Sequence, residues 1–138
     1  MKKSVRIFAF AMVAIMLCLA FASCGGPNAD PEKALDALKK NGVEWAVKDD
    51  TVQPAIYRAA GINGVKTVVS GTGEIDGNLA HITILYFENS NYANEEWENI
   101  QKYADEKKKD GVEDSEWVCK KSGKMIYFGT KNAIEAAK

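Results

Sequence analysis

Residues 79–87 read LAHITILYF, and this stretch decides the fold. Its β-branched and aromatic residues occupy both sets of alternating positions, so a strand formed here is apolar on both faces. Such a strand is typical of the centre of a sheet. Residues 65–70, VKTVVS, are also rich in β-branched residues, and a polar loop with three glycines separates the two stretches. We therefore expect two neighbouring strands, the second of them central.

A second pair of strands is expected near the end of the chain. Residues 116–121 and 124–128 flank a Ser-Gly dipeptide, which is a candidate two-residue hairpin loop. This loop would pair Trp117 with Phe128 and turn both side chains toward the core.

Helical patterns surround these strands. Apolar residues recur every three or four positions, or capping residues mark the ends, in residues 30–40, 52–60, 92–109 and 131–138. The second of these helices should bury an apolar stripe made of Val52, Ala55, Ile56, Ala59 and Ala60. Between the first two helices, the alternation of Val43, Trp45 and Val47 predicts a half-buried strand.

Together these elements predict one small α+β domain, residues 30–138. We expect an antiparallel sheet of about four or five strands with helices packed on one face. The order ββα occurs twice after an initial α-β-α segment, which predicts a ββα-ββα arrangement.

The first 23 residues have the pattern of a secretory signal. Lys2, Lys3 and Arg6 are the only charged residues there, and an apolar run, residues 7–21, follows them. Fifteen helical residues span about 22 Å, which is shorter than the ~30 Å hydrocarbon core of a bilayer. We therefore expect a cleaved signal peptide, residues 1–23, rather than a permanent anchor.

The end of this segment indicates how the mature protein is held. Residues 19–24, LAFASC, resemble the lipobox of bacterial lipoproteins, with Phe21 in the aliphatic position and two small residues before Cys24. The resemblance implies diacylglyceryl transfer to the Cys24 thiol, cleavage before it and acylation of the new amino terminus. The alternative is ordinary cleavage after Ala22, because Ala20 and Ala22 also fit the small-residue rule of signal peptidases.

The mature chain would then consist of the lipidated cysteine with a short flexible tether, residues 24–29, and the domain. It keeps 15 basic and 19 acidic residues. We expect an extracytoplasmic protein that is lipid-anchored to the cell membrane, or to the outer membrane if the cell has two. An acidic domain at that address is not expected to bind nucleic acid.

Few residues suggest chemistry. Cys119 is the one thiol left beside a lipidated Cys24, and strand alternation turns it toward the core, although a reactive thiol is the alternative. His81 is the single histidine and lies in the expected central strand. One histidine and one free cysteine do not predict a zinc site, residues 74–78 lack the spacing of a calcium loop, and no phosphate-binding glycine motif occurs. No cofactor or catalytic residue is predicted.

Two surface features suggest binding instead. Tyr86 and Tyr127 lie opposite their phenylalanine neighbours and could form an uncovered aromatic face of the sheet. Lysines at 107–109, 120, 121 and 124 could attract anionic lipid or peptidoglycan. The sequence therefore favours an envelope lipoprotein that acts as a non-catalytic binding or assembly module for an envelope protein or glycan. The alternative is an envelope enzyme or redox protein that uses Cys119 or His81.

Overall fold

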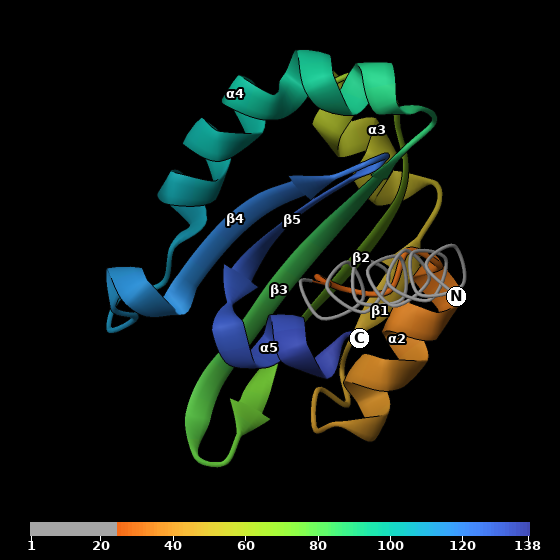
Figure 1. Cartoon of the computed structure of the whole chain (residues 1–138). Helices are drawn as coiled ribbons and strands as arrows, with labels where there is room; N and C mark the ends of the chain where they lie inside the picture. The colour runs from red at the N-terminus through yellow and green to blue at the C-terminus, as the bar shows by residue number, and fades with distance from the viewer. Residues whose placement is uncertain (1–24) are drawn as a thin grey trace, which may run out of the picture.

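An antiparallel five-stranded sheet in the order β1-β2-β3-β5-β4 forms the centre of the computed structural model, which describes residues 25–138 (Figure 1). The strands are β1 Val47–Asp49, β2 Val65–Ile75, β3 Asn78–Phe87, β4 Trp117–Ser122 and β5 Met125–Thr130. The helices are α2 Pro31–Lys40, α3 Val52–Ala59, α4 Ser90–Lys107, the short 3₁₀ helix η1 Asp114–Glu116, and α5 Lys131–Ala136. The α+β class, the antiparallel sheet and the ββα-ββα order are confirmed.

The central position of β3 is also confirmed, because it pairs with β2 on one side and β5 on the other. The expected glycine-rich loop is mostly strand, however. β2 continues to Ile75 and turns at Asp76 and Gly77, which both have positive φ. Within this extension Gly71 allows the chain at Val43 to pack closely on β2, because a Cβ at position 71 would come within 2.7 Å of the Val43 side chain.

Helices cover both faces of the sheet, rather than the one face expected. One core cluster contains residues of α2 and α5, and a second contains residues of α3 and α4. Residues of β3 alternate between the two clusters: Ile84 and Tyr86 belong to the first, and Leu85 and Phe87 to the second. The apolar character of both faces of β3 thus reflects two separate helix layers.

The proposed aromatic face of Tyr86 and Tyr127 is wrong. Only 7% and 4% of their surfaces are exposed, because α2, α5 and the chain at residues 25–28 cover this side of the sheet. The Tyr86 hydroxyl donates a hydrogen bond to the carbonyl oxygen of Asn28, at 2.7 Å. The two tyrosines are core residues.

Three local expectations also need correction. In α3 the apolar stripe faces solvent, with Ile56 52% exposed, while Pro54 and Tyr57 are buried. The expected strand at 43–47 is a loop up to Val47, and Trp45 is 83% exposed. The second hairpin turns at Gly123-Lys124, which pairs Cys119 with Phe128 and shifts the register by two residues without changing the faces.

Among residues 25–138, no helix is both long and apolar enough to cross a membrane. The expected signal peptide and Cys24 lie outside the described residues.

Candidate functional site

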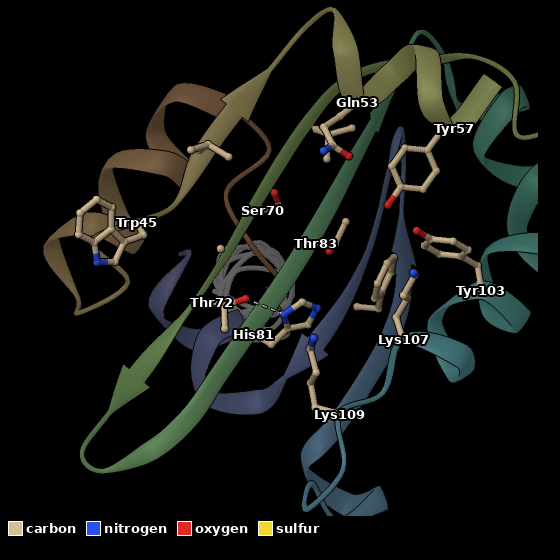
Figure 2. A pocket seen from close by; sticks show the side chains of 14 residues that line it. Trp45, Gln53, Tyr57, Ser70, Thr72, His81, Thr83, Tyr103, Lys107 and Lys109 are labelled. Carbon is tan, nitrogen blue, oxygen red and sulfur yellow. Dashed lines mark hydrogen bonds between the residues drawn. The ribbon is translucent and has the colours of Figure 1, made fainter. Parts of the chain in front are cut away.

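A groove of about 510 Å³ lies on the face of the sheet that carries α3 and α4 (Figure 2). Its floor is made of two cross-strand pairs between β2 and β3. Ser70 is opposite Thr83, and Thr72 is opposite His81.

The floor is polar because the strands extend beyond the helices that cover them. Ser70 and Thr72 lie on the same face of β2 as Val68, because alternate residues of a strand share a face, and Val68 packs in the core beneath these helices. On β3, Thr83 and His81 likewise share a face with Leu85, which belongs to the same core cluster as Val68. One continuous strand face therefore changes from apolar core to polar groove where the helices end.

The two walls differ in chemistry. Trp45 and Val47, which are 83% and 55% exposed, lie at the β1 edge. Lys107 at the end of α4 and Lys109 just beyond it lie at the opposite edge, as Figure 2 shows. The groove thus has an apolar aromatic rim and a cationic rim with hydroxyl groups between them.

The cationic rim carries uncompensated charge. No aspartate or glutamate lines the groove, and neither Lys107 nor Lys109 takes part in an ion pair with the described residues. The Lys107 Nζ lies 5.1 Å from the centroid of the Tyr103 ring, a cation–π contact that leaves the charge in place. An anionic ligand therefore fits this rim.

His81 is held firmly in the floor. Its Nδ1 lies 3.0 Å from the Thr72 hydroxyl oxygen, and its ring stacks on Trp117 with centroids 5.8 Å apart. Burial, and secondarily the charge of Lys109, lowers the pKa of His81 below the usual value of 6.5. The imidazole is therefore neutral at pH 7 and offers hydrogen bonds rather than charge.

Two phenols complete the wall beneath α3 and α4. Tyr57 and Tyr103 meet edge to face with ring centroids 5.5 Å apart, and both line the groove. Burial, with the neighbouring Tyr103 as a smaller cause, raises the pKa of Tyr57 above its usual range. The Tyr57 hydroxyl therefore stays protonated and can donate a hydrogen bond.

Of the residues singled out from the sequence as possible chemical or binding groups, His81 and two of the lysines, Lys107 and Lys109, line this groove. Cys119 packs beside the core cluster of Phe128 and does not line the groove, and burial, more than the charge of Asp105, raises the pKa of its thiol to about 11. Tyr86 and Tyr127 lie on the other face of the sheet. A reactive Cys119 thiolate is therefore disfavoured, since nucleophilic cysteines need a lowered pKa.

Sequence reasoning named Lys107 and Lys109 as possible anion-binding residues but missed most of the groove around them, namely Trp45, Ser70, Thr72 and Thr83. One signal was available: polar residues interrupt an otherwise apolar strand face at Ser70 and again at Thr83. No group of three or more histidine, cysteine or acidic side chains within residues 25–138 is arranged to hold a metal ion.

Fold and groove together define a small α+β domain with a basic, aromatic-rimmed groove on its sheet. No family model matches the chain, and comparisons with curated proteins and with solved structures find no match either.

Proposed function

We propose that this protein is an envelope lipoprotein whose domain binds a small anionic ligand in the groove without transforming it. The observation that carries the proposal is that Lys107 and Lys109 line a groove to which residues 25–138 contribute no carboxylate, and that these residues form no ion pair with the two lysines. The hydroxyl groups of the groove floor and a neutral His81 beside them supply hydrogen bonds that fix the orientation of a ligand.

The two rims suggest the shape of the ligand. A carboxylate or phosphate group would lie between Lys107 and Lys109, and the apolar C–H face of a sugar ring would pack on the exposed indole of Trp45. The volume of about 510 Å³ falls within the range of about 300–1,000 Å³ that is usual for small-ligand sites. A sugar that bears a carboxylate or phosphate group, as found in envelope glycans, combines these features.

The envelope address rests on the sequence of residues 1–24. The charged, apolar and small-residue segments and Cys24 support export and lipidation of the mature amino terminus. Palmitate labelling of cells that produce the wild type or Cys24→Ala tests this part. Label in the wild type alone is expected, and equal labelling of both chains would refute lipidation at Cys24.

Binding is tested on the protein purified from membranes in detergent. Tryptophan fluorescence is followed during titration with acidic sugars and with their neutral counterparts, because Trp45 is exposed at the rim. We expect saturable binding of the acidic sugars only. Lys107→Gln with Lys109→Gln should weaken it by about tenfold or more, which corresponds to ~1.4 kcal/mol.

Lys102→Gln is the matched control, because Lys102 is exposed on the same helix but does not line the groove. Equal weakening by the control and by the double variant would show a general charge effect and would refute the groove as the site.

A second candidate is an enzyme that uses His81. The Thr72 hydroxyl oxygen lies 3.0 Å from His81 Nδ1, the separation at which a neutral imidazole acts as a base that activates a hydroxyl nucleophile. Incubation of a bound acidic glycan with wild type and with His81→Gln separates the two functions. Consumption of the glycan by the wild type alone would favour the enzyme, and recovery of intact glycan from both supports binding without turnover.

A further inference from the structure

The tether that follows Cys24 is docked on the domain. The Asn28 backbone N–H donates a 2.8 Å hydrogen bond to the Ala137 carbonyl oxygen, and the Asn28 carbonyl accepts one from Tyr86. Pro27 is buried, and Gly26 lies so close to the Tyr127 ring that any Cβ at this position would collide with it. The expected flexible tether is therefore a fixed part of the domain surface from Gly25 onward.

Gly25 lines a pocket of about 370 Å³ between β4, β5 and α5. Three exposed lysines line the same pocket: Lys120, Lys131 and Lys138. We call the surface formed by Gly25 and these lysines the anchor face.

The anchor face and the groove lie on opposite sides of the sheet. Lys120 is paired with Tyr127, whose ring belongs to the cluster beneath α2 and α5. The adjacent residue Phe128 points the other way and lines the groove. Successive residues of a strand face opposite sides, so this assignment follows from the register.

The charge of the anchor face is positive. Among residues 25–138, Glu135 is the one acidic residue that lines the pocket, and its side chain pairs with Lys138 at 2.8 Å. Lys120 and Lys131 form no ion pair with the described residues. Two lysines without an ion pair among the described residues thus line the same pocket as Gly25, which directly follows the expected lipidation site.

We propose that the anchor face lies against the anionic phospholipid headgroups of the membrane and that the groove points away from it. The inference rests on the proposed lipidation of Cys24. Acyl chains on Cys24 would hold the next residue, Gly25, at the bilayer surface, and the lysines that line the same pocket as Gly25 would then face the headgroups. Exposed charges attract one another over a screening length of ~8 Å at physiological salt. Each lysine at an anionic surface favours the orientation in which the anchor face touches the membrane by about fivefold, so Lys120 and Lys131 together favour this orientation by roughly 25-fold.

The orientation is tested on the lipidated protein reconstituted in vesicles that contain phosphatidylglycerol and a headgroup nitroxide lipid. In a Cys119→Ser background, a fluorophore is attached to Ser115→Cys, which lines the anchor-face pocket, or to Gln101→Cys on α4. Both positions are exposed and uncharged, so neither label removes a lysine. We expect strong quenching at position 115, little at 101, and loss of the difference at high salt.

Charge reversal is the decisive variant. Lys120→Glu with Lys131→Glu should lower quenching at position 115 to the level at 101, while the lipid keeps the protein on the vesicles. Equal quenching at both positions in the lysine-bearing protein, or quenching at 115 that is unaffected by reversal, would overturn the proposed orientation. If the anchor face instead binds a glycan, equal quenching at positions 115 and 101 is expected.

Failure of lipidation is detected separately. In the Cys119→Ser chain without a labelling site, Cys24 is the only cysteine that remains once Cys18 has been removed with the signal peptide. Reaction of the unfolded mature protein with a thiol reagent would show a free Cys24 and would overturn the lipid anchor together with this inference. An unreactive Cys24 with equal quenching overturns the orientation alone.

Discussion

Replacement of Gly129 by alanine is predicted to lower the stability of the fold and to weaken ligand binding in the groove, because Gly129 packs against the backbone of Ile82 in the core and of His81 in the groove floor. The residue lies in β5 opposite Ile82 of β3 with φ +149°, a region that side-chain-bearing residues rarely adopt. A Cβ there would collide with the backbone carbonyl oxygen of His81 and with the backbone of Ile82. Backbone atoms of a central strand cannot rotate away as the end of a flexible side chain can.

The size of the effect follows from these two costs. Unfavourable backbone geometry costs about 1–3 kcal/mol, and separation of β5 from β3 adds lost packing, so we expect a total above about 3 kcal/mol. Gly123→Ala is the matched control, because Gly123 has φ +58° in the hairpin turn and nothing lies within 4 Å of the place that a Cβ would occupy. Its cost should be about 1–2 kcal/mol, from conformation alone.

The assay is reversible denaturant unfolding of both variants, with acidic-sugar binding measured under native conditions. Displacement at Gly129 also shifts His81, whose backbone N–H donates to the Thr130 hydroxyl at 3.0 Å, so binding should weaken in this variant and not in Gly123→Ala. If Gly129→Ala were as stable as Gly123→Ala, the close approach of β5 to β3 would be refuted.

Three further outcomes are expected. Because the pKa of His81 is lower in the folded state, the unfolded chain binds more protons, and stability should fall as the pH drops below about 6.5; His81→Gln should remove this part of the pH dependence in urea titrations at pH 7.5 and 5.5. The Cys119 thiol should react slowly with an aromatic disulfide reagent at pH 8 and rapidly in urea, and equal rates would contradict its raised pKa of about 11. Ile56→Ala should change the unfolding free energy by less than about 0.5 kcal/mol, whereas Ile84→Ala should cost about 2–5 kcal/mol; similar losses would contradict an exposed Ile56.

The parts of the fold that could be predicted depend on local properties of the chain. β3 is recognisable because both faces of one segment are apolar, whatever covers them. The second hairpin was placed correctly, with Cys119 on the expected face, but its turn begins one residue later than expected. Moving a turn by one residue shifts the register by two and keeps every side chain on its face. The prediction of the core therefore survived an error in the turn.

The errors arose where two surfaces compete for the core. The 3/4 spacing of apolar residues in α3 correctly indicated a helix, but small alanines on one side and Tyr57 on the other offered two faces to bury. The phenol ring removes more apolar surface from water, and it also packs on Tyr103. Ile56 was left in solvent as a result. Periodicity alone does not compare such areas.

The groove could not be predicted because it depends on a difference in length between elements. β2 and β3 pair over residues 65–75 and 78–87, whereas α3 has only eight residues and α4 ends at Lys107. The strands therefore extend beyond their helical cover, and the half-buried Ser70 and the buried Thr83 face the groove on a side that is apolar two residues away. If the strand lengths had been known, these polar residues would have indicated which part of the sheet the helices leave open. Because residues 71–78 were expected to form a loop, this part of the sheet was not predicted.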